Sequence, residues 1–332
     1  MSKKKTTSSL KTKLGQFEWK ASPYLYIAPF YILFLIVGLF PLLFTLWVSM
    51  RQYNTLTGDS GWASCGATCG TSANSWWGNF AWVIHQQSFW YALRNTISIF
   101  LLSNIPQLML SLLLAWILDA NLKAKTFWRM GVLLPYVVAP SAAGIIFSQI
   151  FSDNMGALNA LLQAVGLQPI MWHANTLAAH IAIATIVSFR WTGYNALIFL
   201  AAMQAIPRDV MEAAVVDGAG KARTFFSVTL PMLKPTLVFV IINSTIGGLQ
   251  IFDEPQLFSA STNVGGPNYQ FLTVSLYLWD LGFNKVSIGQ PNMGRAAAVA
   301  WILFLLIVLI AVLNFLLTQR LGNSKPKKRV EK

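Results

Sequence analysis

Charged residues are scarce in this chain of 332 residues. Asp, Glu, Lys and Arg make up 11% of it, against about 25% in ordinary soluble domains. Hydrophobic residues account for 55%, which exceeds the roughly 45–50% that is usual in soluble proteins. The shortage of charge therefore argues against a soluble domain and indicates a protein that lies in a membrane.

Histidine and cysteine are also few. His85, His173 and His180 show no mutual motif spacing and no partner acids at a recognisable distance, so we predict no catalytic residues and no enzyme activity in this chain. Cys65 and Cys69 lie in a loop that is permissive for a disulfide, and a disulfide and two free thiols both remain open. No third or fourth ligand lies near them, so we predict no metal site.

Runs of apolar residues recur along the whole chain. Each is near the roughly 20 residues that a helix needs to cross a bilayer, and the first is too long for a cleaved signal peptide. We predict an all-α, polytopic membrane protein with six transmembrane helices. The spans lie near 24–49, 90–118, 130–151, 178–201, 236–258 and 296–318. Prolines in the first three are expected to bend them, namely Pro29, Pro41, Pro106, Pro135 and Pro140.

The positive charges are distributed unevenly around these spans. The formal net charge is +13, and most of the 24 Lys and Arg fall on one side if the spans alternate. This positive-inside pattern predicts that the chain lies in a cell membrane with both termini on the cytoplasmic side. The chain then divides into a basic tail (1–23), a transmembrane domain (24–320) and a second basic tail (321–332). Basic tails of this kind lie near anionic lipid headgroups, and we predict no nucleic-acid partner. Trp76, Trp77, Trp82 and Trp90 are expected to form an interfacial aromatic belt on the other side.

One short polar stretch, EAAVVDGAGKARTFFSVTLPMLKP, lies between two apolar runs. Its GAGK resembles a phosphate-binding loop, but Ala222 follows the lysine and Val215 takes the place of the first glycine, so the required pattern is missing. A helix beginning at Pro207 and stopped by Gly218 fits better. Its small face would consist of Val210, Ala213 and Ala214. A second short helix should follow before Pro231 and Pro235. Either a structural elbow or a docking element fits this pattern.

The same stretch resembles the signature of binding-protein-dependent ABC importer permeases. That signature is Glu-Ala-Ala, three residues, Gly, nine residues, a branched aliphatic, one residue and Leu-Pro. It matches Glu212, Ala213, Ala214, Gly218, Val228, Leu230 and Pro231 here, with the commoner isoleucine replaced by Val228. The resemblance continues over about residues 24–320 and is greatest to carbohydrate permeases of the maltose and oligosaccharide type, with some likeness to cellobiose permeases. The segments that carry it include RMGVLLPYVVAP, GALNALL and LAAMQAIPRDVMEAAVVDGA.

The resemblance implies partners and roles that the residues alone do not. Residues 202–235 would form a coupling loop that docks on an ATPase subunit, with a second homologous permease, two ATP-binding subunits and an extracytoplasmic sugar-binding protein completing the importer. ATP would be hydrolysed by the partners, and no cofactor is expected in this chain. The residues assigned to coupling are Glu212, Ala213, Ala214, Asp217, Gly218, Leu230 and Pro231.

A charge inside a predicted span is costly and usually functional, and three such residues stand out. They are Arg190, Asp253 and Glu254. Amides and aromatic rings surround them in the sequence, and this combination suits a sugar. The predicted substrate path comprises Arg190, Tyr194, Asn195, Gln250, Asp253 and Glu254. Two other interpretations stay open: a structural ion pair between Arg190 and one of the acids, or acids at the outer mouth.

Three other functions remain as alternatives. An ABC permease for a different solute, such as glycerol phosphate, would carry the same coupling signature. A self-sufficient secondary transporter would be expected to show two repeated halves, which we do not see. A membrane-embedded hydrolase would need a nucleophile and a base at recognisable spacing.

Overall fold

The fold is known from a computed structural model that describes residues 22–66, 69, 71–120, 123–259, 264–283 and 291–322. The side chains of 71–73 and 317–322 are not described. Both predicted basic tails lie almost entirely outside these residues. Within them the chain is mainly helical, with two small β-hairpins.

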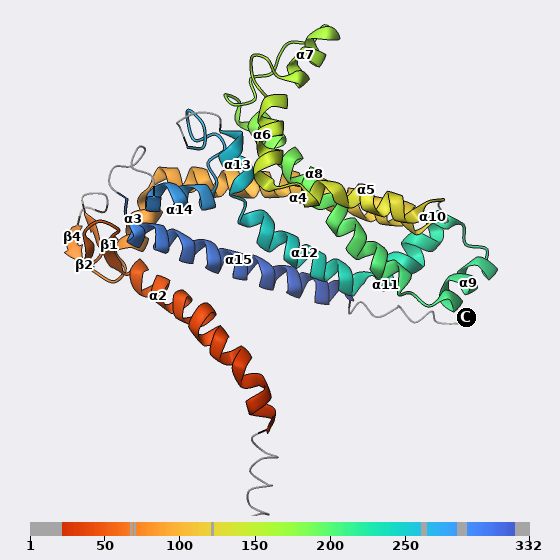
Figure 1. The fold of residues 1–332 in the computed structure, drawn as a ribbon, viewed down its shortest axis with the longest axis horizontal. Coiled ribbons are helices and arrows are strands. Elements are labelled where there is room, and N and C mark those ends of the chain that lie inside the picture. Colours follow the sequence, from red (N-terminus) through yellow and green to blue (C-terminus); the bar gives the residue numbers. More distant parts are fainter. Residues whose placement is uncertain are drawn as a thin grey trace, which may run out of the picture.

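Among the residues that the structure describes, four continuous helices are long and apolar enough to cross a membrane. The first covers Ser22–Ser49 and includes a π-helical turn, η1 (Phe34–Leu39), before α2 (Phe40–Ser49). The others are α4 (Gln87–Asp119), α8 (Thr176–Gln204) and α15 (Met293–Gly322). In Figure 1 α4, α8 and α15 run lengthwise through the bundle, whereas α2 diverges from it.

Two further spans are bent, which brings the number of spans up to six. Helices α5 (Lys125–Val137) and α6 (Pro140–Ile150) meet at 85°, next to Pro140 and close to Pro135 as the sequence predicts. Helix α12 (Lys234–Leu249) follows the segment 221–232 at 70°. By contrast, α4 continues through Pro106 as one helix.

The fifth predicted span is wrong in its second half. It was expected to run from 236 to 258, but α12 ends at Leu249, and a separate short helix, α13 (Asp253–Phe258), follows. Gln250 closes α12, and Phe252 has backbone angles outside the helical range (φ −133°). The sequence does not reveal this break, because the residues remain apolar at the point where the chain changes direction.

Helices α4 and α8 form the centre of the bundle, and hydrogen bonds join them to each other. The Ser111 hydroxyl donates to the carbonyl of Thr192 (2.8 Å), and the Ser188 hydroxyl donates to the carbonyl of Ser103 (3.2 Å). On the other side of α8, Gly193 admits α5, since a β-carbon there would strike the backbone carbonyl of Val132. Small residues and hydroxyls at such crossings are typical of helices packed within a bilayer.

A compact unit that the sequence did not predict lies between α2 and α4. Strands β1 (Arg51–Asn54) and β2 (Gly58–Trp62) form one antiparallel hairpin, and β3 (Ser64–Gly66) and β4 (Thr71–Asn74) form a second. Helix α3 (Gly78–His85) follows. The unit contains a disulfide between Cys65 and Cys69, whose Cα atoms lie 5.7 Å apart.

One member of the predicted aromatic belt belongs to the interior. Trp76, Trp77 and Trp90 are exposed, but the side chain of Trp82 is buried at 6% exposure. The guanidinium of Arg295 lies over its ring, 4.0 Å from the centroid. Trp82 therefore packs α3 against the start of α15, where a cation over an indole face is favourable.

The first hairpin should loosen in acid. The Arg51 guanidinium bonds the Asp59 carboxylate (2.7 Å), which holds the pKa of Asp59 below its usual value, and the Gly61 amide adds to the effect. A lowered folded-state pKa stabilises the hairpin above the unfolded-state pKa, and this stabilisation is lost as pH falls through the folded-state value. The protection factors of the 51–62 amides in the full protein, which compare measured exchange with the intrinsic rate at the same pH, should therefore fall below about pH 4. Asp59→Asn should show low protection factors at every pH; a variant as protected and as pH-sensitive as the wild type would contradict this.

Candidate functional site

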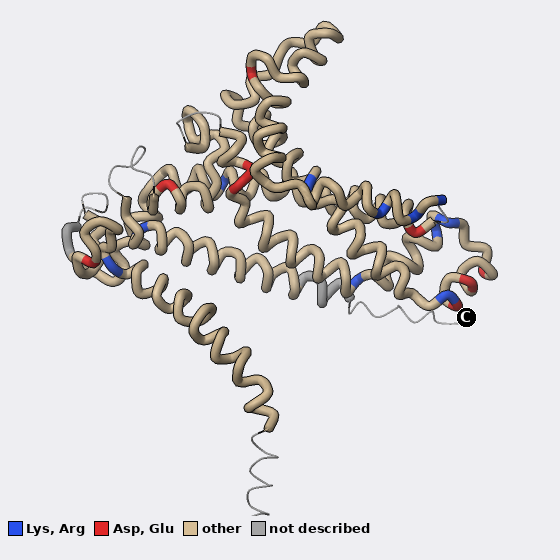
Figure 2. Tube along the Cα trace, in the orientation of Figure 1, with Lys and Arg blue, Asp and Glu red and all other residues tan. Residues whose placement is uncertain are grey.

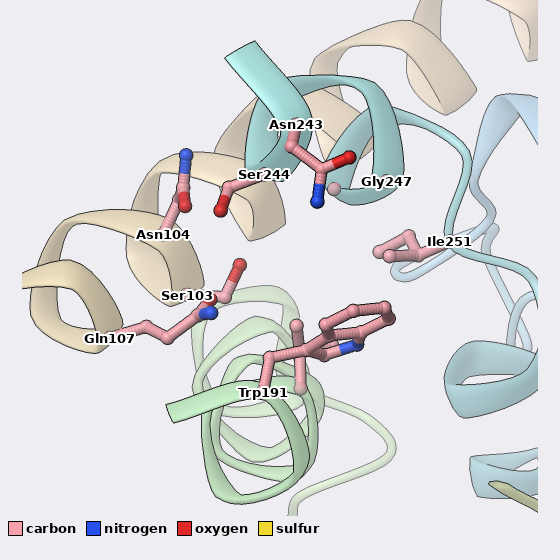
Figure 3. A pocket seen from close by; sticks show the side chains of 10 residues that line it. Ser103, Asn104, Gln107, Trp191, Asn243, Ser244, Gly247 and Ile251 are labelled. Atoms are coloured by element: carbon pink, nitrogen blue, oxygen red, sulfur yellow. The ribbon is translucent and has the colours of Figure 1, made fainter. Parts of the chain in front are cut away.

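A polar pocket lies between three helices near the middle of the bundle. Its walls come from α4, α8 and α12, and the side chains converge on a common space (Figure 3). The lining residues are Ser103, Asn104, Gln107, Val187, Trp191, Asn243, Ser244, Gly247, Gly248 and Ile251. Amides and hydroxyls therefore surround one indole ring in the interior of the bundle, where apolar side chains would be expected.

One amide in this pocket has an unsatisfied oxygen. Asn104 is 7% exposed, and its Oδ1 is buried without a hydrogen bond among the described residues. A buried acceptor of this kind costs about 1–3 kcal/mol when left unsatisfied, and hence favours a bound molecule that can donate to it. The cavity of ≈30 Å³ has room for a water or two. A sugar would require α12 to move away from α4 and α8.

Helix α12 also carries a polar stripe on its exposed side. Asn243, Gly247 and Gln250 are all accessible and follow one another at helical spacing. A β-carbon on Gly247 would meet no described atom within 4 Å, whereas Gly248 packs against the Phe100 ring of α4. Accessible amides on a membrane helix avoid lipid, so this stripe is expected to face water or another protein.

Two of the three charged residues predicted for the substrate path form an ion pair with each other. Arg190 Nη1 donates to Glu254 Oε1 at 2.6 Å, and the two side chains are buried (10% and 6% exposed). Glu254 lies in the first turn of α13 and not inside a continuous span, and its neighbour Asp253 is exposed. The structure therefore has the structural ion pair that the sequence left open, and it ties α13 to α8.

Aromatic rings flank the pocket where α5 meets α8. Tyr136 stacks on Tyr194 with centroids 4.7 Å apart, and Trp191 meets both rings edge-on. Asn195 is buried, and its amide donates to the Ser244 hydroxyl of α12 (3.3 Å). Of the predicted path, Tyr194 and Asn195 thus lie around the pocket, while Gln250 lies on the polar stripe of α12.

Several residues of this site were missed from the sequence, among them Asn104, Gln107, Asn243 and Tyr136. They are uncharged and have ordinary helix propensities, so no local signal marks them. The available clue was spacing: a polar cluster at 103–107 inside one apolar run and amides at 243 and 250 in another. Which clusters face each other follows only from the packing of α4 against α12.

The segment with the Glu-Ala-Ala signature forms a helical elbow at one end of the bundle. Helix α9 (Arg208–Val216) begins after Pro207, and Gly218 then takes a left-handed conformation (φ +74°). The chain continues as α10 (Lys221–Thr224), the π-helical η3 (Phe225–Thr229) and α11 (Leu230–Met232). Figure 2 shows charged residues gathered around this end, whereas the middle of the bundle carries few.

The faces of α9 differ from the expectation in one respect. Ala214 is buried at 7% exposure, so it belongs to the face packed on the protein and does not share an open stripe with Val210 and Ala213. Of the residues assigned to coupling, Glu212, Ala213, Asp217, Gly218 and Pro231 are exposed, and Leu230 is half-buried. Val215 and Val216 beside them are 68% and 87% exposed. The exposed face of α9 therefore combines acidic and aliphatic side chains.

Comparison with known proteins agrees with this geometry. Residues 80–323 match the family model "Binding-protein-dependent transport system inner membrane component". A lactose transport system permease protein of Rhizobium radiobacter is 36% identical over 241 residues, 72% of this chain and 78% of that protein. An arabinooligosaccharides transport system permease protein of Halalkalibacterium halodurans is 31% identical over 301 residues, 90% and 88% of the two chains. A bacterial ABC transporter involved in the import of the acidic polysaccharide alginate has the same fold (TM-score 0.73, 19% identity), and the match covers 94% of this chain and 100% of that one.

Proposed function

The chain belongs to the binding-protein-dependent transport system inner membrane components, and we propose that it is the permease subunit of an ATP-driven importer for a di- or oligosaccharide. The membership confirms the resemblance drawn from the Glu-Ala-Ala signature. Relatives named for lactose and for arabinooligosaccharides support a sugar as cargo. We propose that an extracytoplasmic binding protein delivers the sugar and that the permease passes it on by alternating access.

The coupling role rests on α9. Its face from Glu212 to Gly218 is exposed except at the buried Ala214, and α9 contacts α10, which continues through η3 and α11 to α12. A helix with an uncovered outer face in this position can pass the movement of an attached ATPase subunit to α8 and α12, which flank it in the chain. In this proposal α9 lies in the cytoplasm together with both termini, and the hairpins lie outside. Two ATP-binding subunits would hydrolyse ATP, and this chain would need no cofactor.

The polar stripe of α12 supports a second permease as partner. Asn243, Gly247 and Gln250 would be costly against lipid. Against a homologous subunit they would instead line a shared, water-filled path. The pocket behind the stripe, with Asn104 and Trp191, supplies the amides and the ring face that a sugar needs. We propose that the path opens between the two permeases when α12 moves.

The main support for this function is that one chain contains both an exposed helix suited to coupling and an uncharged polar pocket. The test is uptake by liposomes that contain this chain with its co-encoded permease and ATPase, supplied with the co-encoded binding protein. We expect uptake of labelled lactose, maltose, trehalose or cellobiose only with ATP inside the liposomes. Uptake by this chain alone, driven by an ion gradient, would contradict the proposal and establish a secondary transporter.

A further inference from the structure

The pocket between α4, α8 and α12 offers hydrogen bonds but no charge. None of the described residues that line it is Asp, Glu, Lys or Arg. Its polar groups are the amides of Asn104, Gln107 and Asn243 and the hydroxyls of Ser103 and Ser244. Amides and hydroxyls can each pair with a sugar hydroxyl, because every one of these side chains has both an acceptor and a donor.

Three charges lie close to the pocket along the chain: the exposed Asp253, which is an anion, and a pair that bind each other. Arg190 directly precedes the pocket residue Trp191, and Glu254 follows the pocket residue Ile251 by three positions. The two bind each other at 2.6 Å, and both are buried. The charge of the guanidinium is therefore balanced by Glu254, although its Nε has no hydrogen-bond partner among the described residues, and an anionic cargo would compete with Glu254 for it. A buried anion without such a partner is strongly disfavoured.

The unsatisfied acceptor in the pocket points to the same chemistry. Asn104 is more than nine-tenths buried, and its Oδ1 accepts no hydrogen bond from any described residue. A hydroxyl donates to such an oxygen, whereas a phosphate or carboxylate presents only lone pairs to it. Gln107, 4% exposed, lies one turn along α4 in the same wall. Both amides lie on α4 and line the pocket, so a cargo that enters the pocket would meet them.

We propose that this pocket selects uncharged, hydroxyl-bearing cargo and excludes phosphorylated or carboxylated sugars. The inference rests on the proposed sugar import and adds the charge class of the cargo. Selection here acts inside the membrane and is separate from the choice made by a binding protein. It also argues against glycerol phosphate as the cargo.

The test measures direct binding to the purified transport complex in nanodiscs, without the binding protein. Calorimetry compares lactose, maltose, trehalose and cellobiose with the 6-phosphate of each sugar. We expect at least one neutral sugar to bind and its phosphate to bind at least tenfold more weakly. The decisive variant is Asn243→Lys, which puts an unpaired cation at an accessible position of the pocket wall. It should improve binding of the phosphate roughly tenfold, as a charge-assisted hydrogen bond does.

The matched control is Asn243→Gln, which keeps an uncharged amide at the same position and should leave the preference unchanged. Equal binding of a sugar and its phosphate to the wild type would overturn the inference while leaving sugar import in place. An Asn243→Lys complex that rejects the phosphate as strongly as the wild type would also overturn it, because charge in the pocket would then not set the preference. Binding of none of the eight compounds, together with no ATP-dependent uptake, would instead refute the proposed function.

Discussion

Replacement of Glu254 by Ala should destabilise the protein by about 3–5 kcal/mol, the usual cost of leaving a buried charge without its partner. Arg190 and Glu254 are 8% and 4% exposed, and a 2.6 Å hydrogen bond joins them. Without the carboxylate, the guanidinium remains in the interior with no anion beside it. Chemical unfolding of the protein in mixed micelles would measure the loss.

The neighbouring acid provides the control. Asp253 lies in the same first turn of α13 but is exposed, so Asp253→Ala should cost less than about 1 kcal/mol. The double variant Arg190→Met with Glu254→Met should recover most of the loss, since apolar residues of similar size can replace a buried pair. A double variant as unstable as Glu254→Ala would show that packing, and not the unpaired charge, determines the effect.

The pair matters because α13 is held at both ends. Glu254 fixes its first turn to α8, while His173 Nε2 lies 3.1 Å from the carbonyl of Phe258 at its last residue. The His173 ring also stacks on Phe258 with centroids 4.4 Å apart, and its Nδ1 lies 3.3 Å from Asp153. Helix α13 thus closes the pocket end of α12 as an anchored element. In the proposed opening of the path, α12 would therefore move against α13, at Gln250 to Phe252.

The sequence predicted the spans well, because length and hydropathy alone determine what can cross a bilayer. It did not place the break after Leu249, since Ile251 and Phe252 continue the apolar run even though the helix has ended. The prolines did not predict the positions of the bends consistently. Pro140 marks a bend of 85°, whereas α4 passes through Pro106 without interruption. A proline removes one donor, and the packing around it decides whether the helix turns.

The functional residues also divide into those that a local sequence pattern identifies and those that only the packing of the helices reveals. The Glu-Ala-Ala signature could be recognised because its spacing is local, and Gly218 has the left-handed conformation that a terminating glycine predicts. The cost of a charge in an apolar run identified Arg190 and Glu254. Asn104 and Asn243 could not be found in this way, because an amide in a helix is unremarkable until three helices bring such groups together. The inward position of Ala214 likewise depends on how α9 docks.

Replacement of Gly218 by Val should abolish sugar uptake and leave the protein in the membrane. Gly218 has φ +74°, a conformation that costs a β-branched residue about 1–2 kcal/mol or more. No described atom lies within 4 Å of the place that its β-carbon would take, so the substitution acts on the backbone and not through a clash. The chain would leave α9 in a different direction, and the face from Glu212 to Gly218 would no longer fit an ATPase subunit. Uptake by the reconstituted importer should fall at least tenfold, with an equal amount of protein in the membrane.

Two further substitutions separate geometry from side-chain size. Gly218→Asn should retain part of the uptake, because asparagine tolerates the left-handed region far better than valine does. Gly220→Val should be close to normal, since Gly220 has an ordinary φ of −68° and its β-carbon would also meet no described atom within 4 Å. The expected order of uptake is therefore Gly220→Val, Gly218→Asn, Gly218→Val, which follows backbone conformation, because the same valine is tolerated at one glycine and not at the other. Undiminished uptake by Gly218→Val would remove the coupling role from this elbow, because a helix whose end can be redirected without consequence cannot be the element that transmits the ATPase movement.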